Sequence, residues 1–149
     1  MESNNAKKVS RQRLQKLLEM KGVRPSFQRL RILEILAGTT SHPSVDDIYQ
    51  ELLSEIPTLS RTTVYNTLNL MVEKKLVLAL SMSDAGMRYD FNTAPHTHFF
   101  CNLCSRVIDV DTELPESLLR ESVDGHKIDD THIYLNGTCK YCLAQSETA

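Results

Sequence analysis

Apolar residues in the first half of the chain recur at intervals of three and four positions, which is the spacing of an amphipathic helix. The pattern predicts a first helix over residues 10–21, before Gly22, and a second between an N-cap at Ser26 and Gly38. The apolar positions that define these two helices are Leu14, Leu17, Leu18, Leu30, Leu33 and Leu36. The chain is therefore expected to begin with two short helices.

A third helix is predicted to begin at the capping-box pattern Ser44-x-x-Asp47 and to continue to Ile56, the residue before a proline. Its apolar stripe is the most regular in the sequence and consists of Val45, Ile48, Tyr49, Leu52, Leu53 and Ile56. Ser60 is the expected N-cap of a fourth helix, which extends to about Lys74.

Two short apolar segments, residues 76–81 and 87–91, follow the fourth helix. The residues Ser83-Asp84-Ala85-Gly86 between them predict a hairpin turn. Helices followed by a hairpin are the layout of a winged helix, a variant of the helix-turn-helix. We therefore predict a winged-helix domain over residues 1–92.

The pattern changes after a predicted hinge at residues 93–95. Strands are predicted at 98–101, 107–110 and 131–135, with a short helix near 115–123. A second, small α/β domain is thus expected over residues 96–149. The predicted fold class is α+β, with an N-terminal winged helix-turn-helix domain followed by this small domain.

One face of the fourth helix carries hydrogen-bonding side chains and no acid. Such a face suits a helix in the DNA major groove, where Arg and Asn contact base edges and Ser or Thr contacts phosphates. An ordinary solvated face would more often contain Glu and Lys. The residues are Arg61, Thr62, Tyr65, Asn66 and Asn69, of which the first four are our candidate DNA contacts.

The distribution of charge supports a polyanion as partner of the first half. The net charge of the whole chain is −2, but residues 1–93 contain 13 Lys and Arg against 10 Asp and Glu, and residues 94–149 contain 4 against 9. The two parts therefore carry +3 and −5. No apolar run is long enough to cross a membrane and the N-terminus lacks a secretory core, so we expect a soluble, cytoplasmic protein.

All four cysteines fall in two Cys-x-x-Cys pairs, Cys101/Cys104 and Cys139/Cys142. This spacing lets one turn present two sulfurs to a tetrahedral ion, so the pairs predict one Zn(II) site. Four cysteines leave no open coordination position, and the site should be structural. Disulfides are not expected without a secretory signal. A thioredoxin-like redox pair usually occurs once and begins a helix, so two pairs favour zinc.

A second set of metal-ligand residue types lies close to the cysteines in sequence. His96-x-His98 precedes the first pair, and alternation along a strand places both imidazoles on one face. His42, Asp90 and Asp109 are further candidates, although spacing alone does not single them out.

Together these segments resemble the ferric uptake regulator family of bacterial metal-dependent repressors, from about Arg11 to Cys142. The resemblance rests on GVRPSFQRLRIL, HPSVDDIY, SRTTVYNTL, RYDF, HTHFFCNLC and CKYC. It implies a homodimer with a C-terminal dimerisation domain, a palindromic operator in double-stranded DNA and a regulatory site for Fe(II) or Mn(II). Carried over by position, the regulatory ligands are His42, Asp90, His96, His98 and Asp109.

Within the family, two features resemble the peroxide-response branch: both carboxylate ligands are Asp, and the fourth helix contains Tyr65-Asn66. That branch implies a repressor in which peroxide reacts at bound Fe(II) and oxidises a ligand histidine, His42 or His96. An iron-responsive repressor, or a zinc- or manganese-uptake repressor, is the alternative within the family.

Two functions from other classes explain these residues less completely. A structural zinc-binding interaction module would explain the cysteines but not the histidines and the aspartate pair. A metallohydrolase could use a His/Asp site with an open position, but a catalytic base in a closed cleft is not evident, and the polar face of the fourth helix would go unexplained. We therefore expect a regulator and not an enzyme.

Overall fold

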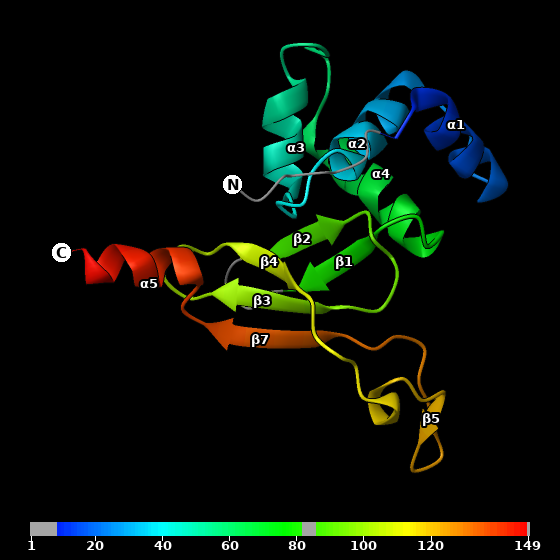
Figure 1. Ribbon diagram of the computed structural model, residues 1–149. Helices are drawn as coiled ribbons and strands as arrows, with labels where there is room; N and C mark the ends of the chain where they lie inside the picture. Colours follow the sequence, from blue (N-terminus) through cyan, green and yellow to red (C-terminus); the bar gives the residue numbers. More distant parts are fainter. Residues whose placement is uncertain (1–8, 82–85, 149) are drawn as a thin grey trace. The chain divides into compact units, whose positions relative to one another are not determined.

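Each helix of the N-terminal half begins at a serine whose side chain caps it in the computed structural model (Figure 1). In every case the serine hydroxyl accepts a hydrogen bond from the backbone N–H three residues later, which satisfies one of the free donors of the first turn. The helices and their caps are α1 Arg11–Met20 after Ser10, α2 Phe27–Ala37 after Ser26, α3 Val45–Leu52 after Ser44, and α4 Arg61–Glu73 after Ser60.

The structure describes residues 9–81 and 86–148. The chain divides into two compact units, Met1–Thr93 and Ala94–Ala149, which we call the N-terminal and C-terminal units. Of the predicted hairpin turn, residues 83–85 lie outside the described residues. Among the helices of the described ranges, none combines the length and the apolar character that a membrane span requires.

The N-terminal unit is a winged helix, as predicted. Strands β1 Leu78–Ser81 and β2 Met87–Asp90 pair antiparallel, with Leu78 opposite Asp90. The four helices and the hairpin enclose one apolar core, in which the inward face of α4 is fully buried. Its central side chains are Leu14, Leu18, Ile32, Leu33, Leu36, Ile48, Leu52, Val64, Leu68, Met71 and Tyr89.

Helix α3 is shorter than its apolar pattern predicts. It ends at Leu52, and turns follow up to Ile56, where the sequence predicted continued helix. The ring of Pro57 disfavours helical backbone at the residue before it, so the chain leaves the helix early. Ile56 still packs in the core, with 7% of its surface exposed. The apolar period therefore predicted burial correctly but helix length incorrectly.

The C-terminal unit is built on a three-stranded sheet in the order β4-β3-β7 (Figure 1). The central strand β3, Thr97–Cys101, pairs antiparallel with β4, Val107–Val110, and parallel with β7, Ile133–Gly137. Helix α5, Lys140–Glu147, follows β7 and was not anticipated from the sequence.

The helix predicted near 115–123 is wrong. The structure has only a 3₁₀ turn, η2 Glu116–Leu118, followed by a two-stranded ladder of β5 Ser122–Val123 and β6 His126–Lys127. Asp124 and Gly125 connect the strands with φ values of 48° and 80°. Asp-Gly is a preferred sequence for a hairpin turn with two positive φ angles, and this signal outweighs the weak helical pattern.

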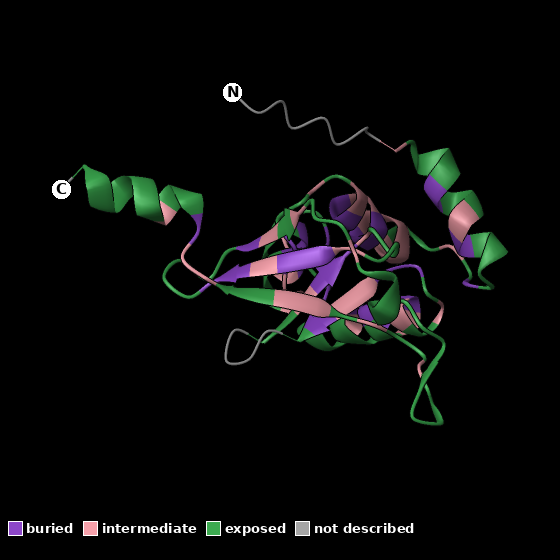
Figure 2. Cartoon of the chain, turned by 60° about the horizontal axis from the view of Figure 1, so that its bottom comes forward, coloured by how far each residue is buried: buried purple, intermediate pink, exposed green. Residues whose placement is uncertain are grey.

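The C-terminal unit has a thin core. Among its described residues, the buried apolar side chains are Phe100, Cys101, Val107 and Cys139, and three of the four come from β3 or a cysteine pair. Figure 2 shows β3 largely buried, whereas α5 is mostly exposed. A unit this small often needs a metal or a partner subunit to be stable. A structural metal bound by the cysteines would therefore contribute strongly to the stability of this unit.

Candidate metal centres and DNA-contact face

The four cysteine sulfurs come together at one end of the C-terminal sheet. Cys101 ends β3, Cys104 lies in the turn after it, and Cys139 and Cys142 begin α5. The sulfurs all lie within 4.8 Å of one another, with 3.9 Å between Cys101 and Cys142 and 3.8 Å between Cys104 and Cys139. Four thiolates bonded to zinc at about 2.3 Å are about 3.8 Å apart, so this cluster fits tetrahedral Zn(II) and is too wide for a disulfide.

Backbone N–H groups favour the thiolate form of Cys101, one of the four sulfurs. The Cys139 N–H donates a hydrogen bond to Cys101 Sγ at 3.3 Å. Backbone N–H groups, first that of Cys104 and then that of Cys139, lower the pKa of the Cys101 thiol to about 6. A thiolate is the form that binds zinc, so the fold favours the metal-binding state of this sulfur.

One sequence criterion against a redox role was wrong. The Cys139-x-x-Cys142 pair does begin a helix, because Cys139 is the N-cap of α5. The position of a pair at a helix start therefore does not separate zinc from redox chemistry here. The convergence of both pairs on one point does separate them, since a redox dithiol needs only two sulfurs.

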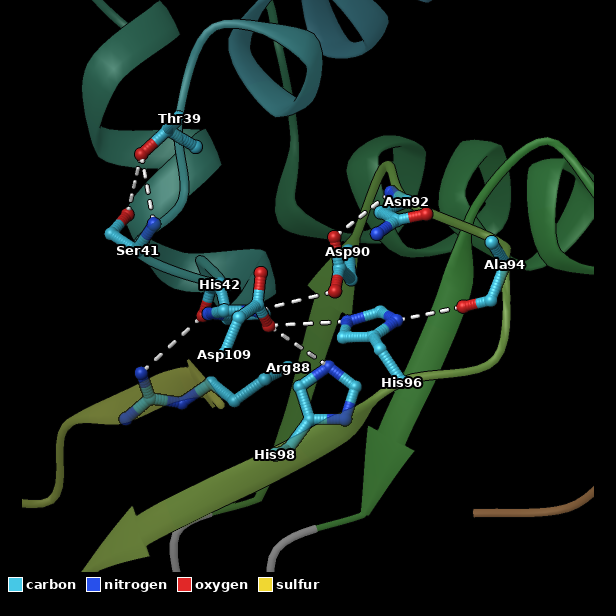
Figure 3. A network of polar contacts seen from close by, with 10 residues as sticks. All are labelled: Thr39, Ser41, His42, Arg88, Asp90, Asn92, Ala94, His96, His98 and Asp109. Atoms are coloured by element: carbon cyan, nitrogen blue, oxygen red, sulfur yellow. Dashed lines mark hydrogen bonds and ion pairs between the residues drawn. The ribbon is translucent and has the colours of Figure 1, made fainter. Parts of the chain in front are cut away.

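Two histidines and an aspartate converge in the C-terminal unit. His98 lies directly opposite Asp109 on the paired strands β3 and β4. Asp109 Oδ1 is 3.3 Å from His98 Nε2 and 3.1 Å from His96 Nε2, and the two imidazole centroids are 4.2 Å apart (Figure 3). Donor atoms about 3 Å apart match neighbouring positions around an octahedral ion.

The hydrogen bond from His96 Nδ1 to the backbone directs the other ring nitrogen, Nε2, toward Asp109. The Nδ1 atom donates to the Ala94 carbonyl at 2.7 Å, which assigns the proton to Nδ1. In the neutral ring the lone pair of Nε2 then faces the Asp109 carboxylate, and two acceptors repel unless a cation or a proton lies between them. A divalent metal ion would accept both lone pairs, and a hydrogen bond from the other ring nitrogen to a backbone carbonyl is typical of metal-binding imidazoles.

The N-terminal unit contributes a second, separate pair of donors. His42 Nε2 lies 3.2 Å from Asp90 Oδ2, and Asp90 Oδ1 accepts a hydrogen bond from the Asn92 N–H at 2.9 Å (Figure 3). Asp90 ends the wing strand β2, and His42 precedes α3. An imidazole and a carboxylate oxygen are the ligand types that Fe(II) and Mn(II) accept.

The backbone of His42 is held in an unusual conformation by the wing. His42 has φ of 54°, a left-handed geometry that costs a non-glycine residue energy. The Tyr89 N–H donates to the Pro43 carbonyl at 3.1 Å, and Arg88 Nη1 reaches the His42 carbonyl at 3.5 Å. These contacts between distant segments were not predicted from the sequence, because no local pattern encodes them.

The four candidate DNA contacts all lie on the exposed face of α4. Arg61, Thr62, Tyr65 and Asn66 are exposed, and Tyr65 retains 50% of its surface. A groove of about 460 Å³ beside this face is lined by Arg24, Ser26, Gln28, Arg29, Thr63 and Thr67, with Pro25. It contains two cations and no acid, as a surface that meets phosphate requires. This groove joins α4 to the start of α2, and no sequence pattern predicted it.

Comparisons with known proteins agree with this architecture. A sequence model of the Ferric uptake regulator family matches residues 20–137. The chain is 36% identical over 127 residues to the "Peroxide operon regulator" of Bacillus subtilis (strain 168), covering 84% of this chain and 88% of that protein. It is 34% identical to the "Peroxide-responsive repressor PerR" of Staphylococcus aureus (strain USA300), covering 84% and 86%.

Solved structures show the same fold. The peroxide stress regulator of Campylobacter jejuni superposes with a TM-score of 0.66 at 29% identity, covering 88% of this chain and 97% of that one. The Helicobacter pylori ferric uptake regulator superposes with a TM-score of 0.68 at 22% identity, covering 89% and 90%. With the family model spanning most of its length, this chain belongs to the ferric uptake regulator family.

Proposed function

We propose that this chain is a homodimeric, metal-dependent transcriptional repressor that senses peroxide. The observation that carries the proposal is the clustering of His96, His98 and Asp109 around one point, in a chain with a cysteine cluster and a winged helix. Its similarity to peroxide-responsive repressors at 34–36% identity supports the sensing branch. The double aspartate of the candidate site supports the same branch.

The cysteine cluster holds structural Zn(II) in this proposal, and the histidines and aspartates hold Fe(II) or Mn(II). The regulatory ligands are His42, Asp90, His96, His98 and Asp109. The division follows ligand chemistry, because thiolates retain zinc and a mixed nitrogen and oxygen set suits iron and manganese. Bound Fe(II) supplies the one-electron chemistry that activates peroxide.

His42 and His96 are the residues that record exposure to peroxide. One oxygen atom of peroxide adds to an imidazole ring, and the other leaves as water. An oxidised imidazole is a weaker ligand, so metal affinity falls and repression ends. His96 is suited to this role because its Nδ1 bond to Ala94 directs Nε2 to the ligand cluster.

Dimerisation is assigned to residues 96–149, DNA binding to residues 1–92, and hinge motion to 93–95. The C-terminal unit exposes apolar side chains that a partner subunit would cover. These are Leu103, Leu118, Leu119, Val123, Leu135, Tyr141 and Leu143. Metal bound by ligands from both units would restrict each winged helix relative to the dimer. Two recognition helices would then fit a palindromic operator at matched spacing.

On the DNA, α4 enters the major groove and the groove beside Arg24 and Arg29 lies against the phosphate backbone. Arg61, Thr62, Tyr65 and Asn66 contact bases or phosphates. Without metal, only a minor fraction of the dimers has the two recognition helices at the spacing of the operator. The apparent affinity for the operator is then reduced in proportion to that fraction.

Mass spectrometry of peptides from Fe(II)-loaded protein tests the proposal. After dilute peroxide, we expect one added oxygen on the peptides that contain His42 or His96, and loss of operator binding. Mn(II)-loaded protein is the matched control and should show neither. Unmodified peptides combined with metal-dependent operator binding would reject peroxide sensing and favour an iron-, zinc- or manganese-uptake repressor. A single zinc per chain without a second metal site would favour a structural module.

A further inference from the structure

An arginine at the start of the recognition helix is held on two sides by the helix before it. Arg61 is the first residue of α4, and its Nε donates a hydrogen bond to Asp46 Oδ1 at 2.7 Å. Its guanidinium carbon lies 4.3 Å from the centroid of the Tyr49 ring. Asp46 and Tyr49 both belong to α3, so the contact joins the two helices of the helix-turn-helix.

Electrostatics favour this pairing. A cation at the N-terminus of a helix is opposed by the helix dipole, and the first turn of α4 contains no acidic residue of its own. Asp46 supplies the missing negative charge, and its hydrogen bond raises the pKa of Arg61. Stacking on Tyr49 adds a cation–π contact and limits rotation of the guanidinium plane. An exposed ion pair alone would restrict Arg61 little, but the two contacts together define one orientation.

The remaining edge of the guanidinium stays available. Arg61 Nη1 and Nη2 donate no hydrogen bond to any residue in the described ranges, and 58% of the side chain is exposed. With Nε engaged by Asp46, two parallel N–H groups are left at the end of the side chain. Guanine presents two acceptors, O6 and N7, in the major groove, and they match such a fork.

We infer that Asp46 and Tyr49 position Arg61 to recognise a guanine in the operator, an inference that rests on the proposed function. The N-terminal residues of a recognition helix are those that contact base edges. A phosphate is the poorer partner, because the Asp46 carboxylate would repel it, whereas a base edge carries no net charge. Asp46 therefore raises specificity by disfavouring contacts to the backbone of unrelated DNA.

The test uses full-length protein loaded with zinc and Mn(II). Wild-type protein first selects duplexes from a random library, and each guanine of the selected duplex is then replaced by 7-deazaguanine, which lacks N7. Affinities are measured for the wild type, Asp46→Asn and Arg61→Lys, on the selected duplex and on a random-sequence duplex. Glu51→Gln removes the same charge from an exposed position of α3 that does not contact Arg61, and it serves as the control.

We expect Asp46→Asn to weaken binding to the selected duplex about tenfold while its affinity for random DNA stays equal or increases. Replacing one guanine by 7-deazaguanine should lower the affinity of the wild type for the selected duplex about tenfold, and it should change the affinity of Asp46→Asn little. Arg61→Lys should show the same insensitivity, because an ammonium group lacks the fork. Arg61 is exposed, so this variant keeps the test valid if Asp46→Asn folds poorly. Glu51→Gln should behave as the wild type.

Two results would overturn the inference alone. One is that every 7-deazaguanine substitution lowers the affinity of the wild type and of the variants by the same factor. The other is that Asp46→Asn tightens binding to both duplexes by the same factor, which would mean that Asp46 only repels phosphate. If wild-type protein with Mn(II) enriches no duplex, the proposed function itself fails, and the inference fails with it.

Discussion

At the residue scale, Asp109 has the largest expected effect on the regulatory site, because one of its oxygens lies within 3.3 Å of two imidazole nitrogens. Asp109→Asn keeps the size of the side chain but removes its negative charge. We expect Mn(II) to bind at least about tenfold more weakly, with zinc content unchanged. Titration calorimetry measures the first and metal analysis the second. Asp111→Asn, an exposed acid just beyond β4, is the control, and equal Mn(II) affinity in both variants would contradict the assignment.

Glu34 provides a residue-scale prediction about pH. It accepts a hydrogen bond from Arg11 at 3.1 Å, which links α1 to α2, and one from Arg31 of its own helix at 2.6 Å. The bond from Arg11, followed by that from Arg31, lowers the pKa of Glu34 below its usual 4.5. A lowered folded-state pKa stabilises the protein above the unfolded value, and this stability is lost as pH falls through the folded value.

Glu34→Gln should therefore cost about 1 kcal/mol at pH 7 and progressively less below about pH 4.5. Urea unfolding followed by circular dichroism at several pH values measures the difference between the wild type and the variant. Zinc release in acid affects both proteins equally and cancels in the difference. A difference that grows toward low pH would show that the sign is wrong.

Contacts between residues close in sequence were predictable, whereas contacts that depend on strand register or tertiary packing were not. The spacing His96-x-His98 predicted that the two imidazoles lie together, although His96 precedes β3 and is not part of the strand. The spacing of the cysteine pairs predicted that their sulfurs meet. The opposition of His98 to Asp109 follows from strand register, which the sequence does not state. The contact between Asp46 and Arg61 joins residues 15 positions apart across a turn, so it depends on tertiary packing.

At the element scale, capping residues predicted helix starts better than apolar periods predicted helix ends. The three predicted serine caps, Ser26, Ser44 and Ser60, are present, because each satisfies a local donor within three residues. The structure adds a fourth cap at Ser10, which was not predicted. The predictions for the end of α3 and for the segment after Pro115 were wrong. At these places the conformational preferences of Pro57 and of Asp124-Gly125 outweigh the apolar period of a helix. A cap is predictable because its hydrogen bond depends on residues three positions apart. Where an apolar helical period competes with a proline or an Asp-Gly turn, the backbone preference of those residues determines the structure.

The capping box of α3 gives an element-scale prediction. Ser44 Oγ accepts from the Asp47 N–H at 3.2 Å, and the Asp47 carboxylate accepts from the Ser44 N–H at 2.9 Å. Ser44→Ala removes the hydroxyl and should destabilise the protein by about 1 kcal/mol. Thermal unfolding by circular dichroism measures this loss. Ser44→Asp, which retains a capping acceptor, should recover most of it, and an equal loss in both variants would argue against capping.

At the scale of the whole molecule, the zinc cluster should determine whether the C-terminal unit folds. Cys101 both ends the central strand and belongs to the four-sulfur cluster. Cys101→Ser should lose zinc, dimerisation and Mn(II) response together, because the thin core cannot replace the metal. Metal analysis and light scattering check these losses. Leu103→Ser, an exposed change in the same turn, should retain zinc, and a Cys101→Ser dimer that still responds to Mn(II) would contradict the link.

The proposal that both units bind one regulatory ion makes the last prediction. His42 and Asp90 offer two donors and the C-terminal unit offers three. If one ion uses both sets, Asp90→Asn should weaken Mn(II) binding as strongly as Asp109→Asn, although the two acids lie in different units. The double variant should then lose less than the sum of the single losses, because both changes act on the same ion.

Linkage extends this test to the DNA. If Mn(II) tightens operator binding by some factor, the operator must tighten Mn(II) binding by the same factor. Both factors should approach one in Asp90→Asn, and they should be compared at one salt concentration, because phosphate contacts are strongly salt-dependent. If Asp90→Asn binds Mn(II) as the wild type does, the C-terminal donors hold the ion alone. In that case a metal confined to one unit could not restrict the winged helix, and repression would need another source of metal dependence.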